Sequence, residues 1–216
     1  TAGARKAIRA LPFPRYYLDF ETYQFVVPVW AGTRPYAQLP FQWSCHIEAK
    51  DHSLKHEHFL SDGSEAPLLD FATSMIKALR KRGPVIVYNA AFERTRIQEL
   101  AAAFPHLAPE LNAIISRLFD LLPIAREHYY HPQMRGSWSI KAVLPTIAPE
   151  LAYDDLDVAN GGMAQDAFAE MMDPETTDER RGQLYNSLLK YCERDTLAMV
   201  RIANYFEGFK AQCLNK

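Results

Sequence analysis

The chain has 216 residues, of which 48% are hydrophobic and 23% are charged, and its formal net charge is −2. These values are typical of a globular protein with a substantial core, and they exclude both a disordered chain and a strong overall attraction to polyanions. Three cysteines, Cys45, Cys192 and Cys213, match neither a disulfide framework nor a zinc site, which favours a reducing, cytoplasmic location. No apolar run approaches the length of a membrane span, and no signal-peptide pattern is present.

Strands are expected mainly in the first part of the chain. Residues 1–14 are predicted to be a loosely held lead, and residues 15–216 a single domain that is part of a longer protein. Alternating or continuous apolar runs predict strands over residues 16–20, 41–48, 55–60 and 84–88. A proline-rich stretch with several aromatic residues follows the first strand, and it either lines a binding groove or packs its aromatics as a surface loop.

Helices are expected to dominate the rest of the chain. Apolar residues at helical spacing predict helices over residues 64–82, 90–103, 140–147, 162–172 and 177–209. We expect Ser64 to cap the first of these helices and Asn89 to cap the second. Strands first, then alternating helix and strand, then helices, predict an α/β domain with a mixed sheet.

Three short motifs carry the functional argument. Asp19 and Glu21, at the end of the first strand, are two residues apart and therefore project to the same face. Like charges on one face repel unless a cation lies between them, and Mg²⁺ favours carboxylate oxygens. The alternative is a strand that runs into solvent with two ordinary surface acids.

The other two motifs lie later in the chain. Glu93 falls in the first turn of the helix that Asn89 opens, where the helix dipole alone could account for a carboxylate. Tyr191 and Asp195 are one turn apart on the last long helix, so their side chains share a face.

Together, and in this order, the three motifs resemble those of the DnaQ-like, DEDD-type 3′–5′ exonucleases, in the subgroup with tyrosine in the third motif. The resemblance covers the chain from Tyr16 to about Phe206. It implies a ribonuclease H-like fold: a mixed sheet whose first three strands are antiparallel, with helices on both faces. It also implies hydrolysis of phosphodiester bonds in DNA or RNA, with a single-stranded 3′ end as the expected substrate.

The resemblance assigns roles to particular residues. Asp19, Glu21, Glu93 and Asp195 would hold two Mg²⁺ or Mn²⁺ ions, which activate a water and clamp the attacking and leaving oxygens. Tyr191 would orient that water or help to deprotonate it. Thr22, Asn89 and Phe92 would lie near the terminal nucleotide or support the site, and Tyr23 and Phe25 could stack a base.

One residue departs from the family pattern. Glu93 stands where the second motif usually has aspartate, and its extra methylene changes the reach of the carboxylate, although we expect it still to bind metal. Asp120 resembles a further aspartate common in these enzymes, as a backup ligand or, as we favour, a structural group. The departure keeps open a second hypothesis, a catalytically weak or inactive nucleic-acid-binding domain of the same fold. An endonuclease and an unrelated structural domain are further alternatives.

The remaining polar residues give weaker signals. His52, His56 and His58 would share one face of a hairpin, as a polar surface rather than a zinc site. Cations near the motifs are candidates to contact a nucleic-acid backbone, and these are Arg94, Arg96, Arg126, Arg135 and Lys141. A second group of cations lies at the end of a predicted helix, where the helix dipole alone accounts for basic residues. These are Lys77, Arg80, Lys81 and Arg82.

Overall fold

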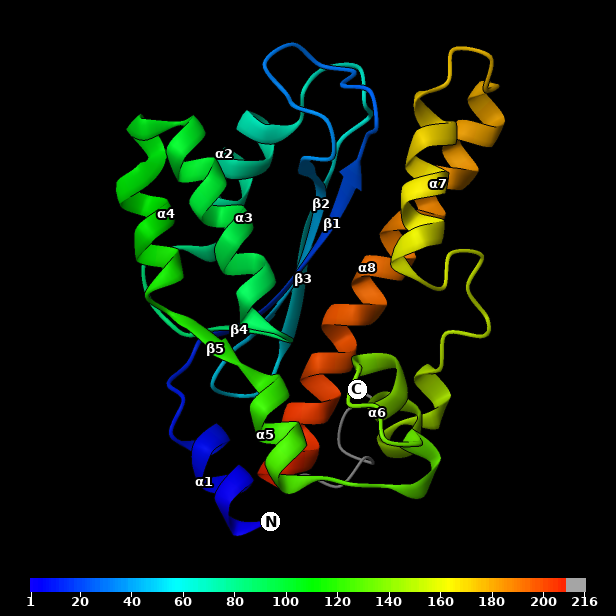
Figure 1. Ribbon diagram of the computed structural model, residues 1–216. Helices are drawn as coiled ribbons and strands as arrows, with labels where there is room; N and C mark the ends of the chain where they lie inside the picture. Colours follow the sequence, from blue (N-terminus) through cyan, green and yellow to red (C-terminus); the bar gives the residue numbers. More distant parts are fainter. Residues whose placement is uncertain (209–216) are drawn as a thin grey trace.

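A computed structural model describes residues 1–208 and shows an α/β domain built on a mixed sheet of five strands with helices on both faces (Figure 1). The strands are β1 (Arg15–Gln24), β2 (Gln38–Glu48), β3 (Leu54–Leu60), β4 (Val85–Val87) and β5 (Leu118–Asp120). Their order in the sheet is β3-β2-β1-β4-β5. The pairs β1–β2 and β2–β3 are antiparallel, whereas β1–β4 and β4–β5 are parallel. The first strand of the chain therefore lies at the centre of the sheet.

Helices cover the sheet in two layers. One face carries α2 (Leu68–Leu79), α3 (Ala90–Ala103) and α4 (Ala108–Ile115). The long α8 (Asp178–Glu207) crosses the other face, accompanied by α6 (Ile140–Ile147) and α7 (Gly161–Met172) (Figure 1). The remaining helices are α1 (Ala2–Arg9), α5 (Leu121–His128) and the short 3₁₀ segments η1 (Pro105–Leu107), η2 (Pro132–Met134) and η3 (Pro149–Leu151). No helix within residues 1–208 has both the length and the apolar character to cross a membrane.

Strand β1 separates an apolar layer from a polar one. Three of its side chains pack into the core shared with α2 and α3, and these are Tyr16, Leu18 and Phe20. The alternate residues face α8, and they include the two predicted acids, Asp19 and Glu21. Their partners on the neighbouring β2 are Ser44 and Gln42, both buried and polar. The interface between the sheet and α8 is therefore polar at this level, which is unusual for the interior of a domain.

The N-terminal lead differs from the expectation. Residues 2–9 form α1, and Ala4 and Ile8 are fully buried against α5 and the end of α8. The prediction of a loosely held lead was wrong, because the two apolar residues are one turn apart and give the helix a face to bury. The short β5 was also missed, since three residues give too short a pattern to recognise.

Two helix caps also differ from the expectation. Asn89 adopts a left-handed conformation (φ 82°) and its side chain makes no capping hydrogen bond. Asp120 caps instead, because its carboxylate accepts hydrogen bonds from the backbone N–H groups of Asn89 and Ala90, each at 3.0 Å. It also accepts one from Leu122, at the start of α5. The helix expected over residues 64–82 is α2, which begins at Leu68 without a cap from Ser64 and ends at Leu79.

The long α8 closely follows its sequence pattern. Thr177 caps its start by accepting a hydrogen bond from the backbone N–H of Arg180, and Gly208 ends it in a left-handed conformation (φ 92°). The expected end at residue 209 lies outside the described residues.

Candidate functional site

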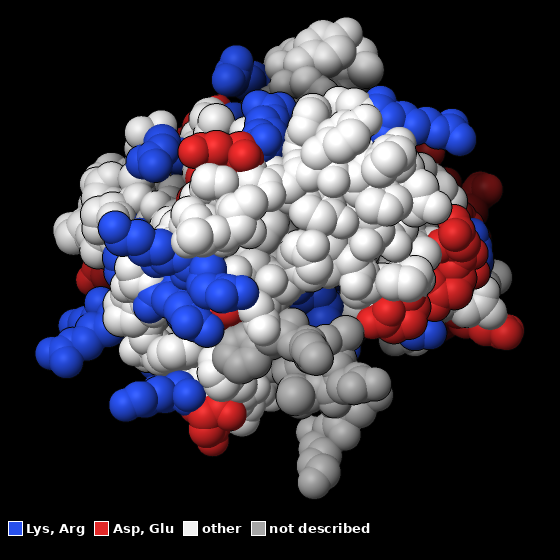
Figure 2. Space-filling model, turned by 90° about the horizontal axis from the view of Figure 1, so that it is seen from below, with Lys and Arg blue, Asp and Glu red and all other residues white. Residues whose placement is uncertain are grey.

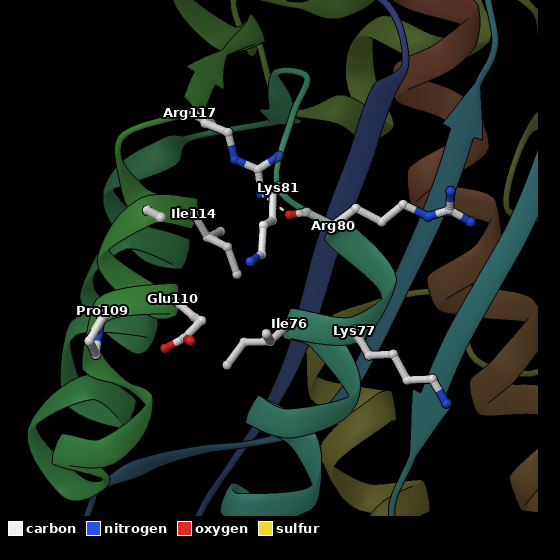
Figure 3. A pocket seen from close by; sticks show the side chains of 9 residues that line it. Ile76, Lys77, Arg80, Lys81, Pro109, Glu110, Ile114 and Arg117 are labelled. Atoms are coloured by element: carbon white, nitrogen blue, oxygen red, sulfur yellow. Dashed lines mark hydrogen bonds between the residues drawn. The ribbon is translucent and has the colours of Figure 1, made fainter.

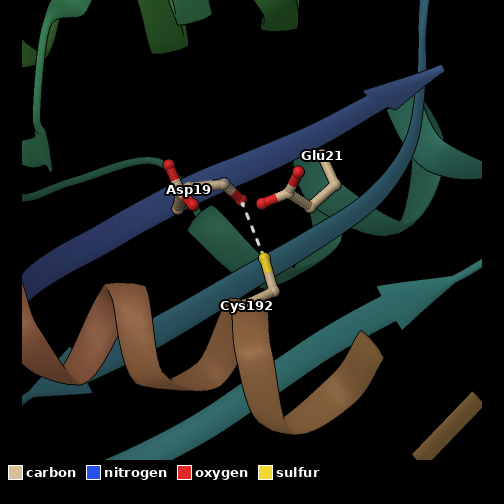
Figure 4. Close-up of side chains that lie close together, drawn as sticks. All are labelled: Asp19, Glu21 and Cys192. Carbon is tan, nitrogen blue, oxygen red and sulfur yellow. Dashed lines mark hydrogen bonds between the residues drawn. The ribbon is translucent and has the colours of Figure 1, made fainter. Parts of the chain in front are cut away.

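The two acids of β1 come together with a cysteine of α8. Ligand atoms of Asp19, Glu21 and Cys192 all lie within 4.8 Å of one another (Figure 4). Asp19 is partly exposed, whereas the other two side chains are buried. The Cys192 thiol donates a weak hydrogen bond of 3.9 Å to the backbone oxygen of Asp19. The strand alternation therefore places the two acids on one face, as predicted, and that face lies against α8.

The pairing of β1 with β2 is irregular directly after these acids, where Phe41 of β2 has no partner on β1. The pairing shifts register between Glu21 and Thr22. A β-bulge of this kind bends a strand and re-aims its side chains, and bulges occur often beside functional sites. Thr22 is buried next to this shift. Tyr23 and Phe25, which follow, pack on each other at 3.7 Å between ring centroids, so part of their ring surface is already covered by protein.

Asp195 reaches the same region from α8. It is buried and accepts a hydrogen bond from the phenol of Tyr153. Its charge raises the pKa of Asp19 after the larger effect of burial, and that of Glu21 after burial and the Asp19 charge.

Glu93 and Asp195 lie outside the close group formed by Asp19, Glu21 and Cys192, and the charge of Asp19 acts on Glu93. Glu93 lies in the first turn of α3, directly after β4, and is 1% exposed. Burial raises its pKa well above the ordinary value, and the charge of Asp19 raises it further. Its Oε2 atom has no hydrogen-bond partner among the described residues. A buried carboxylate oxygen without a partner raises the free energy of the folded state, so a cation or a hydrogen-bond donor bound beside it would be stabilising.

Tyr191 is held in place by Lys141. Its hydroxyl accepts a hydrogen bond of 2.6 Å from Lys141 Nζ, and Asp195 lies one turn further along α8. Burial raises the pKa of Tyr191 far above its ordinary value, and the charges of Glu21, Asp195 and Asp19 add to this effect. The phenol therefore stays protonated, and it can orient a neighbouring group but is poorly suited to accept a proton.

Tyr153, Lys141 and Cys192 were missed as members of this site by sequence reasoning. Tyr153 lies in a loop after η3, and Lys141 is the second residue of α6. No motif marks either residue, and Lys141 was noted only as one of several cations near the motifs. Cys192 was noted as one of three cysteines that match neither a disulfide framework nor a zinc site. Its pKa is raised well above the ordinary value by burial and the adjacent acids, so it stays a thiol.

The other predicted substrate-binding residues lie at the start of α3. Asn89 donates its backbone N–H to Asp120, and Phe92 packs on the core with the Arg96 guanidinium 5.6 Å from its ring. Asp120 therefore acts as a structural cap, as favoured from the sequence. Arg96 is buried and pairs with Glu99, so it is unavailable to a nucleic-acid backbone.

The histidines do not form one exposed face: His46 is buried, His56 is partly exposed, and His58 is exposed and stacks on His56. His46 and His56 lie 4.8 Å apart, and both are linked by hydrogen bonds to Ser44 or Thr196. Burial lowers the pKa of His46 to about 3, so this ring is neutral. His52, expected on the same face, instead pairs with Glu48 in the turn after β2.

A pocket of about 470 Å³ lies between α2 and α4, on the face of the sheet that α8 does not cover (Figure 3). Figure 2 shows lysine and arginine side chains gathered on the same side of the molecule. Arg117 uses its N–H groups to bind the backbone oxygens of Leu79, Arg80 and Gly83. The Lys81 ammonium points toward Glu110 across the pocket. Arg117 of this pocket therefore binds the carbonyl groups at the end of α2. The carboxylate cluster remains the candidate site.

Comparison with known proteins identifies relatives of the chain. A family model described as "Domain of unknown function (DUF2779)" matches residues 16–139. An uncharacterized protein of Mycoplasma pneumoniae is 29% identical over 90% of this chain and 32% of its own length. Uncharacterized proteins of Mycoplasma genitalium and Ureaplasma parvum are 25% and 27% identical, each over 89% of this chain and 32% and 31% of their own lengths. The chain thus spans about a third of these relatives. No solved structure gives a significant match.

Proposed function

We propose that this chain, which belongs to the DUF2779 family, is a metal-dependent 3′–5′ exonuclease of ribonuclease H-like fold that hydrolyses phosphodiester bonds of DNA or RNA. The observation that carries the proposal is the pair of acids Asp19 and Glu21, which lie together against α8, with Asp195 and Glu93 near enough for their charges to interact with that of Asp19. Asp19 and Glu21 come from β1, Glu93 from α3 and Asp195 from α8. An antiparallel β1–β2–β3 meander followed by the parallel strands β4 and β5 supports the fold assignment.

The donor set fits hard divalent cations. Four carboxylates supply oxygen ligands, which Mg²⁺ and Mn²⁺ prefer. Burial raises the pKa of all four, and the charge of a neighbouring acid raises the pKa of Asp19, Glu21 and Glu93 further, so a bound cation would favour their ionised forms. The unpartnered Oε2 of Glu93 supports a cation at this site. We propose that Asp19, Glu21, Glu93 and Asp195 hold two such ions. The Cys192 thiol, which is protonated, is not a ligand in this proposal.

The chain's own residues then divide the work of hydrolysis. Bound divalent ions supply Lewis-acid activation of a water and neutralise phosphate charge. Tyr191 is held by the hydrogen bond from Lys141, so it would orient the attacking water by hydrogen bonding. Tyr153 fixes the carboxylate of Asp195 by a hydrogen bond. In-line attack on the last phosphodiester breaks its bond to the 3′ oxygen and releases a nucleoside monophosphate.

The setting of the enzyme is part of the proposal. Cys45 and Cys192 are free, buried thiols, as suits the reducing cytoplasm. A single-stranded 3′ end is the proposed substrate, and other domains of a longer chain could hold the rest of the strand.

The test is degradation of 3′-labelled and 5′-labelled single-stranded DNA and RNA with Mg²⁺ or Mn²⁺. We expect a ladder that shortens stepwise from the 3′ end and disappears with EDTA and in the Asp19→Ala/Asp195→Ala variant. A Glu65→Ala/Glu127→Ala variant, which removes two exposed carboxylates, is the matched control and should keep full activity. Strand binding without cleavage would favour the inactive binding domain, and cleavage of a circular strand would favour an endonuclease.

A further inference from the structure

Lys141 brings a positive charge to the rim of the carboxylate cluster. Its ammonium lies 4.6 Å from the centre of the Tyr191 ring and 5.3 Å from that of Tyr153. Its hydrogen bond goes to the Tyr191 hydroxyl at 2.6 Å. Its side chain is partly exposed, so the ammonium is reachable from solvent on one side and faces the acids on the other.

Two tyrosines connect Lys141 to the acids. Tyr153, whose ring centre lies 5.3 Å from the Lys141 ammonium, donates a hydrogen bond to Asp195. Among the described residues, however, no carboxylate lies within the 4.0 Å of an ion pair with its ammonium. Lys141 therefore lies near the cluster without forming an ion pair with any one of its acids.

This placement differs from that of the structural cations in the same protein. Arg15 is 1% exposed, forms direct contacts with Glu207 and Glu48, and fixes chain segments. Lys141 instead donates to a neutral phenol and keeps part of its hydration. An ammonium with three donors that spends one on Tyr191 has two left for an anionic ligand.

We propose that Lys141 is a phosphate-contacting residue of the site, which binds a non-bridging oxygen of the substrate's scissile phosphodiester and repels divalent ions from the carboxylates beside it. The inference rests on the proposed exonuclease function and adds to it a residue with two opposed effects. A fixed cation stabilises the charge that develops on phosphate in the transition state. The charge of Lys141 also repels Mg²⁺ or Mn²⁺ near the acids, so it weakens the binding of these ions.

The two effects predict opposite changes in one variant. Lys141→Met keeps the length of the side chain and removes its charge. We expect its Mn²⁺ affinity, measured by isothermal titration calorimetry without substrate, to rise about threefold to tenfold. We expect its kcat on a 3′-labelled oligonucleotide to fall about 100-fold or more. Lys141→Arg keeps the charge and should restore Mn²⁺ affinity to that of the unmodified protein and recover part of kcat.

Lys190→Met is the matched control, because Lys190 precedes Tyr191 on α8 and is exposed. It should change neither quantity. Circular dichroism of each variant checks that the fold is retained, and Lys141→Gln, which also removes the charge, supplies the test if Lys141→Met does not fold. A Lys141→Met protein that binds Mn²⁺ as the unmodified protein does, or more weakly, would overturn the inference while leaving the exonuclease proposal intact. An unmodified protein that neither binds Mn²⁺ nor cleaves any strand would overturn both.

Discussion

The Tyr153 hydroxyl donates a hydrogen bond to Oδ1 of Asp195, and so links the loop after η3 to the third functional motif. Tyr153 is 7% exposed, and its pKa is raised by burial and by the adjacent Asp195, so the phenol remains a donor. The bond fixes the carboxylate of Asp195 in one orientation. A residue outside every recognisable motif therefore positions a proposed metal ligand.

Removing this donor should weaken the site without unfolding it. Tyr153→Phe leaves the ring in place and frees Asp195 to rotate. Because loss of a group that orients a ligand typically costs 10–100-fold, we expect Mn²⁺ affinity or kcat to fall about 10-fold. Calorimetry and the oligonucleotide assay measure both. Tyr130→Phe, at a tyrosine that is 63% exposed, is the control, and equal behaviour of the two variants would contradict the assigned role.

The buried acids should destabilise the metal-free protein as pH rises. Burial raises the pKa of Asp19 well above its ordinary value of 3.8, so the folded protein keeps a proton that the unfolded chain loses. The cost is absent below pH 3.8 and grows until the pH passes the folded-state pKa. With EDTA present, Asp19→Asn should therefore increase the free energy of unfolding at pH 8 by about 1 kcal/mol, and the gain should vanish toward pH 4.

Urea denaturation across this pH range measures the gain. Asp51 is the matched control, because hydrogen bonds from the Ser53 side chain and backbone N–H lower its pKa. Asp51→Asn should bring no gain at pH 8, and a pH-independent effect of Asp19→Asn would contradict the argument.

Divalent metal should stabilise the fold. Binding to the folded state alone adds about 2.7 kcal/mol at a metal concentration 100 times Kd. For a domain of this size, that corresponds to a rise in Tm of about 5–10 °C. Differential scanning fluorimetry with Mn²⁺, and then with excess EDTA, should show the rise and its reversal. The Asp19→Ala/Asp195→Ala variant should lose the response, and an equal rise in that variant would place the metal elsewhere.

Glu93 should prove necessary despite its departure from aspartate. Glu93→Gln keeps the shape of the side chain and removes its charge, so we expect hydrolysis to fall about 100-fold. Glu93→Asp keeps the charge but shortens the reach, and its loss should be smaller. Single-turnover rates of the two variants make the comparison. A Glu93→Gln protein with an unchanged rate would show that Glu93 holds no metal.

The buried ion pair between Arg15 and Glu207 should be a structural element with no part in hydrolysis. Arg15 Nη1 lies 2.9 Å from Glu207 Oε2, which ties the start of β1 to the end of α8. Glu207→Ala leaves a buried guanidinium with less compensation, so the free energy of unfolding should fall by about 3 kcal/mol. Guanidinium denaturation measures this loss. Replacing both residues, as in Arg15→Met/Glu207→Leu, should recover much of it, and a harmless single variant would contradict the prediction.

The sequence by itself determined the elements whose patterns are local. Strand alternation put Asp19 and Glu21 on one face, and helical spacing put Tyr191 and Asp195 on another, because both periods follow from backbone geometry. The order of elements also predicted an α/β domain with a mixed sheet, which the structure confirms. The small N-terminal helix and β5 were missed because their patterns extend over too few residues.

Only the tertiary structure decided what surrounds those acids. Asp120, rather than Asn89, caps α3 because β5 lies beside β4 and brings its carboxylate to the helix start. Lys141 and Tyr153 reach α8 from 50 and 42 residues away in sequence. Charge interactions depend on distance in space, and the packing of α6 and the following loop on α8 fixes that distance. Most strands and helices could therefore be predicted from the sequence, whereas the electrostatics of the candidate site depend on the folded chain.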